Sequence, residues 1–93
     1  MGLAPPGGAP VVVLYGRDGC HLCEEARAAI LELRPELPPF QLREVDIEAD
    51  PALHAAFLER IPVVEVAGGV VSELGLEPAA LERALVDASP RRR

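Results

Sequence analysis

The two cysteines are the residues of this chain best suited to chemistry, because they lie three positions apart in the segment Cys20-His21-Leu22-Cys23. Side chains at this spacing share one face of a helix, with Cβ atoms about 5–6 Å apart. A modest adjustment at the first helical turn would bring the two sulfur atoms into disulfide range. The spacing therefore predicts a pair that cycles between a dithiol and a disulfide.

The two thiols are expected to play different roles. Cys20 directly follows a glycine-containing turn and should begin a helix, where free N–H groups and the helix dipole favour a thiolate. Cys23 lies one turn further along, on the apolar face of the same helix, and should be shielded from water. We therefore expect Cys20 to be the nucleophile and Cys23 to be the thiol that resolves a mixed disulfide held on Cys20.

Charged neighbours are expected to modify the reactivity of Cys20. Arg17, three residues earlier, adds a positive charge near the sulfur and could also hold a substrate carboxylate. His21 could stabilise the thiolate when it is protonated, although it could equally point into water. Glu24 and Glu25 act in the opposite direction, because their carboxylates repel a thiolate. These opposing charges predict that the thiolate form of Cys20 is stabilised, but not to an extreme degree.

Hydrophobic patterns on both sides of the cysteines predict the elements that position them. The continuous apolar run over 11–15 is typical of a central strand that is buried on both faces of a sheet. A helix over 20–33 is indicated by apolar residues at spacings of three and four, namely Leu22, Cys23, Ala26, Ala29, Ile30 and Leu33. The other predicted elements are a strand over 40–47, a helix that begins at Pro51 after Asp50, a strand over 62–66, a turn over 67–69, a strand over 70–73 and a helix over 78–88.

The order of these elements, β-α-β-α-β-β-α, predicts an α/β fold. The first β-α-β unit requires a right-handed crossover, which makes its two strands parallel. The two strands on either side of the turn over 67–69 must be antiparallel, because the connection is too short for a crossover. A four-stranded mixed sheet with helices on both faces is therefore expected.

Length and charge limit the classes of protein to which the chain could belong. With 93 residues, of which 49% are hydrophobic, the chain has enough apolar side chain for one core. We expect a flexible lead over 1–9, a folded domain over 10–88 and a basic tail over 89–93. The formal net charge of −6 disfavours nucleic acid as a partner. Neither a targeting segment nor a membrane span is visible, which indicates a cytoplasmic protein.

Several motifs in this order resemble a known family. A dithiol that follows a strand and a glycine turn comes first, then Arg60-Ile61-Pro62-Val63-Val64 about forty residues later, and then Gly68-Gly69. This arrangement is similar to a glutaredoxin-like protein of the thioredoxin superfamily, and the similarity extends from residue 10 to residue 88. The resemblance implies a thioredoxin-like fold.

The resemblance also implies where a substrate would bind. Pro62 would be the cis-proline that faces the dithiol, which would leave the Ile61 backbone free to pair with an extended thiol substrate. Tyr15, the only tyrosine, could pack nearby. Arg17 matches the basic residue that such proteins place before the nucleophile, and Arg60 could be a second anchor for the carboxylates of glutathione.

The function implied by the resemblance is that of a thiol-disulfide oxidoreductase. It would reduce disulfide-containing proteins or small mixed disulfides, with no bound cofactor, and glutathione or a reductase protein would restore its dithiol. Glutathione-using members carry Cys-Pro-Tyr-Cys, and they have a diglycine and an Asp after the fourth strand. This chain has Cys-His-Leu-Cys, and Val70-Val71-Ser72-Glu73-Leu74-Gly75 in the later position, where Glu73 would repel a carboxylate of glutathione.

Other interpretations of the cysteine pair remain open from the sequence. The pair could be structural, with two cysteines packed as small hydrophobic residues. The domain could also be a non-catalytic binding module that holds a metal ion or an iron-sulfur cluster, or that docks one dedicated protein partner. A zinc site needs four ligands, and only His21 and the distant His54 could join the two thiolates.

Overall fold

The computed structural model of the protein describes residues 8–89 and confirms the predicted order of elements. The strands are β1 (Val11–Gly16), β2 (Gln41–Asp46), β3 (Val63–Val66) and β4 (Gly69–Glu73), and the α-helices are α1 (His21–Leu33), α2 (Pro51–Phe57) and α3 (Pro78–Ala88). Two short 3₁₀ helices, η1 (Arg34–Glu36) and η2 (Ile47–Ala49), follow α1 and β2. Most of the predicted lead and tail, residues 1–7 and 90–93, lies outside the described residues.

The strands form a four-stranded mixed sheet in the order β2-β1-β3-β4. β1 pairs in parallel with β2 and antiparallel with β3, and β3 pairs antiparallel with β4. The predicted central position of β1 and the thioredoxin-like fold are therefore confirmed. Because β1 and β2 are parallel, their carboxyl ends lie at the same end of the sheet. The chain passes from β1 into α1 at this end, through the loop that carries the first cysteine.

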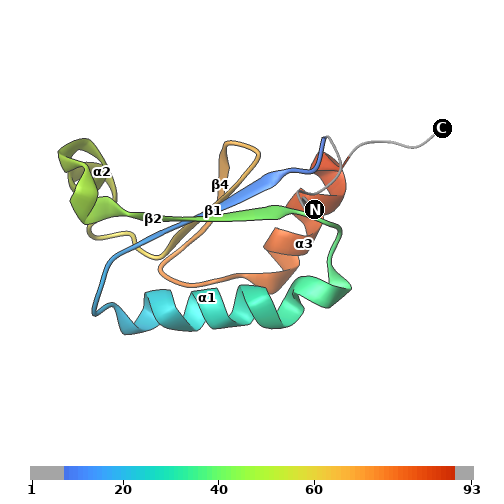
Figure 1. The fold of residues 1–93 in the computed structure, drawn as a ribbon, viewed down its shortest axis with the longest axis horizontal. Coiled ribbons are helices and arrows are strands. Elements are labelled where there is room, and N and C mark those ends of the chain that lie inside the picture. The colour runs from blue at the N-terminus through green and yellow to red at the C-terminus, as the bar shows by residue number, and fades with distance from the viewer. Residues whose placement is uncertain (1–7, 90–93) are drawn as a thin grey trace, which may run out of the picture.

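The hydrophobic core lies on one face of the sheet, beneath α1 and α3 (Figure 1). Val12 and Leu14 of β1 point into it, since alternate residues of a strand face the same side. Ile30 of α1, together with Leu81 and Leu85 of α3, is fully buried against them. The aliphatic core therefore fixes α1, and with it the two cysteines, against the central strand.

The opposite face of the sheet is covered much less, which corrects one prediction. Val11, Val13 and Tyr15 of β1 are only half-buried, so β1 is not buried on both faces. The short helix α2 lies on this side of the sheet, at the carboxyl end of β2 (Figure 1), and it has no buried residue. Its Phe57 contacts Tyr15, with ring centroids 4.7 Å apart.

Local signals in the sequence explain where α2 and the hairpin are found. The Asp50 side chain accepts a hydrogen bond from the N–H of Ala52 at 2.8 Å, and Pro51 occupies the first turn, as predicted. Between β3 and β4, Ala67 and Gly68 both have positive φ, at 51° and 89°. Two such residues form the turn that suits the twist of a β-hairpin.

No helix within residues 8–89 is long and apolar enough to cross a lipid bilayer.

Candidate functional site

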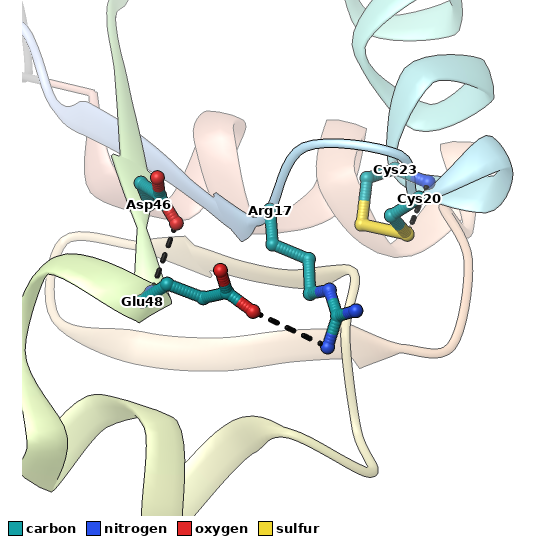
Figure 2. A network of polar contacts seen from close by, with 5 residues as sticks. All are labelled: Arg17, Cys20, Cys23, Asp46 and Glu48. Atoms are coloured by element: carbon teal, nitrogen blue, oxygen red, sulfur yellow. Dashed lines mark hydrogen bonds and ion pairs between the residues drawn. A yellow bond between two sulfur atoms is a disulfide. The ribbon is translucent and has the colours of Figure 1, made fainter.

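Cys20 and Cys23 form a disulfide at the start of α1, with their Cα atoms 5.2 Å apart (Figure 2). Cys20 is the N-cap residue of the helix, and its Sγ accepts a hydrogen bond from the N–H of Cys23 at 3.1 Å. The first N–H groups of a helix have no partner inside the helix, and they favour a negatively charged acceptor. The pair is therefore at disulfide distance, and one of its sulfurs lies where a helix stabilises a thiolate.

The two cysteines differ in how far they are buried. The Cys23 side chain is only 6% exposed and packs on the core side of α1, whereas Cys20 is half-buried. Cys23 lies directly against Gly16, the last residue of β1: a Cβ built on this glycine would lie 3.0 Å from both the Cβ and the Sγ of Cys23. The absence of a side chain at Gly16 is what lets Cys23 approach the central strand.

Replacing Gly16 with alanine is expected to destabilise the fold by about 1–3 kcal/mol, because the added methyl group would overpack a closely filled site. The measurement is the free energy of unfolding by urea, for the oxidised and the reduced protein. Gly69→Ala is the matched control, since a Cβ there would lie 3.8 Å from its nearest neighbour, the Val66 carbonyl oxygen. Equal effects of the two substitutions would show that Gly16 is not closely packed against Cys23.

Arg17 lies in the loop between β1 and α1, and its guanidinium is paired with a carboxylate of the same chain. Its Nη1 is 3.4 Å from Oε2 of Glu48, and both side chains are partly exposed (Figure 2). The Glu48 N–H donates to Oδ1 of Asp46 at 2.9 Å, which fixes the start of η2. The predicted substrate anchor is thus held by an internal ion pair.

His21 and Leu22, the two residues between the cysteines, both face water. The His21 side chain is 83% exposed, and its Nε2 lies 3.0 Å from Oε2 of Glu25 one turn later. Leu22 is 49% exposed, so its predicted place on the buried face of the helix is wrong. The buried face begins at Cys23 and continues through Ala26 and Ile30.

Ile61 and Pro62 directly precede β3, next to the end of β1. Tyr15 pairs with Val63, so the next residues in this antiparallel register are Gly16 and Pro62. Pro62 is fully buried, and the peptide bond that joins it to Ile61 is cis. The Ile61 N–H donates to the Phe57 carbonyl oxygen at 3.0 Å. The expectation of a free Ile61 backbone is therefore wrong for its N–H.

Arg60 contacts both the last residue of β4 and the residue that follows it, and the sequence did not predict these contacts. The Arg60 guanidinium is ion-paired with Glu73 and lies 5.0 Å from the centre of the Phe57 ring. Hydrogen bonding to Arg60 lowers the pKa of the Glu73 carboxyl below its usual range. The N–H of Leu74 donates to the Arg60 carbonyl oxygen at 2.9 Å. Leu74 has a φ of 62° and is 60% exposed, so this loop presents an apolar side chain to water.

A groove of about 270 Å³ opens beside the disulfide, between α1 and the carboxyl end of β2. Cys23 forms part of its wall. Four carboxylates also line it, those of Asp18, Glu24, Glu44 and Asp46. The guanidiniums in the groove are those of Arg17 and Arg27, and Arg27 donates from Nε to both oxygens of Glu44 at 3.0 Å. Asp18 and Glu24 flank the cysteines in the sequence, but the contribution of β2 follows only from the tertiary fold.

Residues 8–89 contain no group of three or more His, Cys, Asp and Glu side chains placed to hold a metal ion.

Comparison with known structures gives the same fold. Protein Ne2328 from Nitrosomonas europaea is 28% identical, with a TM-score of 0.73 over 83% of this chain and 92% of that one. Protein XcR50 from X. campestris is 34% identical, with a TM-score of 0.60 over 85% and 99%. A mutant thioredoxin from Halobacterium salinarum NRC-1 is 19% identical, with a TM-score of 0.62 over 92% and 80%. This last likeness concerns the fold alone.

The comparisons also establish the family of the chain. No curated protein sequence matches it. Residues 11–86 match the glutaredoxin-like domain (DUF836), and this range covers every strand and both cysteines. The protein is therefore a member of the glutaredoxin-like domain (DUF836) family.

Proposed function

We propose that the protein is a thiol-disulfide oxidoreductase that works through Cys20 and Cys23. The observation that carries this proposal is the place of Cys20 as the helix N-cap, where its sulfur accepts the Cys23 N–H. A sulfur in this position gains stabilisation as a thiolate, and the thiolate is the form that attacks disulfides. The half-buried state of Cys20 leaves its sulfur more open to a substrate than the buried Cys23.

The reaction runs in two exchange steps. In the first, the Cys20 thiolate attacks one sulfur of a substrate disulfide, a mixed disulfide forms, and the other substrate sulfur leaves as a thiolate that takes up a proton. In the second, Cys23 loses its proton and attacks the Cys20 sulfur, and the remaining substrate thiolate leaves. The substrate gains two electrons and two protons, and the protein ends with a Cys20–Cys23 disulfide. Glutathione or a reductase protein would then supply two electrons to restore the dithiol.

The segment before β3 is the proposed side from which a substrate chain approaches. Pro62 lies opposite Gly16 when the register of β1 and β3 is extended by one residue, and Gly16 contacts Cys23, so Ile61 and Pro62 border the dithiol. An extended substrate would run along Ile61 and, because the Ile61 N–H already donates to Phe57, would use the Ile61 carbonyl group. Tyr15 supports this edge from the less covered face of the sheet, where it packs on Phe57. A cytoplasmic location, where thiols are kept reduced, would suit this activity.

Reduction of a neutral peptide disulfide by the pre-reduced protein tests the proposal. One equivalent of protein is expected to release one equivalent of reduced peptide and to end with an intramolecular disulfide, measured by mass spectrometry. The double variant Cys20→Ser/Cys23→Ser is the control and should release none. An intact protein that holds reduced thiols but leaves the peptide oxidised would refute the proposed activity. A visible absorption band or bound metal in the fresh protein would favour the binding module instead.

The burial of the two sulfurs predicts a large difference in alkylation rate. In the reduced protein at neutral pH, Cys20 is expected to react with iodoacetamide at least about tenfold faster than Cys23, because thiol reactivity follows thiolate character and access. Peptide mapping after short exposure to the reagent measures the two rates. The urea-unfolded protein is the control, in which the two rates should become similar. Equal rates in the folded protein would contradict the assignment of Cys20 as the nucleophile.

A further inference from the structure

The cationic side chains around the dithiol are already neutralised by carboxylates of the same chain. Within residues 8–89 there are four contacts between a basic side chain and a carboxylate; three involve the loop, helix or groove that carries the cysteines, and the fourth lies at the same end of the sheet, where β3 begins and β4 ends. They join Arg17 to Glu48, His21 to Glu25, Arg27 to Glu44, and Arg60 to Glu73. An anionic substrate would have to compete with a carboxylate already in place at each of the three guanidiniums. The site therefore offers little net attraction for negative charge.

Further carboxylates beside the cysteines have no cation of their own. Asp18 precedes Cys20 in the loop, and Glu24 follows Cys23 in the first turn of α1. Both are exposed and line the groove beside Cys23, and neither has an ion pair within the described part of the chain. Asp46 lines the same groove from β2, with its Oδ1 directed at the Glu48 N–H. The surroundings of the dithiol thus carry excess negative charge, in line with the net charge of −6 for the whole chain.

We propose that the dithiol selects its substrates by charge, and that it reduces disulfides in protein segments rich in Lys and Arg in preference to anionic disulfides such as oxidised glutathione. This inference rests on the proposed oxidoreductase function and leaves its chemical steps unchanged. Opposite charges across an interface accelerate encounter, and like charges slow it. A cationic segment would meet unpaired carboxylates at Asp18 and Glu24, whereas glutathione would bring carboxylates to the same place.

The size of the groove and two exposed leucines at this end of the sheet fit a protein segment. The groove volume of about 270 Å³ lies below the range of about 300–1,000 Å³ that is usual for pockets enclosing a whole small-molecule ligand. It has room for the side chain of one Lys or Arg beside Cys23. Leu22 is 49% exposed between the cysteines, and Leu74 is 60% exposed after β4. Both could contact apolar residues of a protein substrate.

The test compares three peptide disulfides that differ only in the residues flanking each cysteine, which are Arg, Gln or Glu. Each rate constant with the reduced protein is divided by the rate constant with neutral dithiothreitol, because flanking charge also changes the intrinsic reactivity of a disulfide. At 10 mM salt we expect the Arg peptide to react at least about tenfold faster than the Glu peptide, with the Gln peptide in between. The ratio should shrink at 150 mM salt, since the Debye length falls from about 30 Å to about 8 Å.

Charge-neutralising variants identify the groups responsible. Asp18→Asn/Glu24→Gln should lower the Arg-to-Glu rate ratio several-fold, and Glu48→Gln/Glu73→Gln should lower it by freeing Arg17 and Arg60 for anions. Glu32→Gln/Glu82→Gln, which removes two exposed carboxylates from the rest of α1 and from α3, should leave the ratio unchanged. The ratio is the informative quantity, because a change in the reactivity of Cys20 alters all three rates alike. Equal rates for all three peptides would overturn charge selection while upholding the proposed activity, and a failure of all three peptides to react would overturn both.

Discussion

Replacing Cys20 with serine is expected to lower the rate of peptide disulfide reduction by at least about a thousandfold, to the level of the uncatalysed reaction. The loss should be this large because the hydroxyl of serine does not exchange with disulfides, and the reaction depends on one covalent step at this atom. Cys23 is 6% exposed and cannot take over the attack without leaving its position against Gly16. The measurement is the single-turnover release of reduced peptide from the pre-reduced protein.

Cys23→Ser is the matched variant, and its expected result is different. The first exchange still occurs at Cys20, but no second thiol is present to release the substrate, so a stable mixed disulfide should accumulate. Mass spectrometry without reductant would detect one bound peptide per protein, linked through Cys20. A trapped peptide in Cys20→Ser, and none in Cys23→Ser, would reverse the assigned roles of the two cysteines.

The element order could be predicted from the sequence because local signals mark nearly every boundary. Prolines and glycines interrupt the hydrophobic runs, Asp50-Pro51 marks the start of α2, and the sequence around Gly68 marks the hairpin. The alternation of strands and helices then left few topologies, and the handedness rule for crossovers selected one of them. The partial exposure of one face of β1 could not be predicted. A run of Val residues is the same in the sequence whether helix α2 covers several of these residues or only one of them.

The cysteine pair was also evident from local sequence, whereas its electrostatic surroundings were not. The spacing identified Cys20 and Cys23 as a pair, and the glycine-containing turn before Cys20 indicated their place at a helix start. The ion pairs of Arg17 with Glu48 and of Arg60 with Glu73 join residues 31 and 13 positions apart, and only the tertiary fold brings them together. Two side chains expected to bind a substrate are therefore engaged within the chain, and this is one ground for the proposal that the site selects cationic substrates.

Ile30→Ala is expected to cause the largest loss of stability among the substitutions considered, about 2–5 kcal/mol. Ile30 is fully buried where α1 packs on β1, in contact with the cluster that contains Leu14, Leu81 and Leu85. The substitution removes apolar contacts and leaves a cavity that the surrounding aliphatic side chains fill only in part. Because small domains have about 5–15 kcal/mol of total stability, a substantial fraction would be lost. Urea unfolding of the reduced protein measures the change.

Leu31→Ala on the same helix is the control, since the Leu31 side chain is 37% exposed and its loss should cost far less. The comparison also links the core to the site, because α1 carries both cysteines on its first turn. If the core acts only by holding α1 in place, Ile30→Ala should keep the alkylation preference for Cys20 in the molecules that remain folded, at temperatures well below the new midpoint. Similar losses of stability in the two variants would show that α1 does not pack on β1 through Ile30. That result would remove the reason for the buried position of Cys23 and, with it, the physical basis for the two different thiol roles.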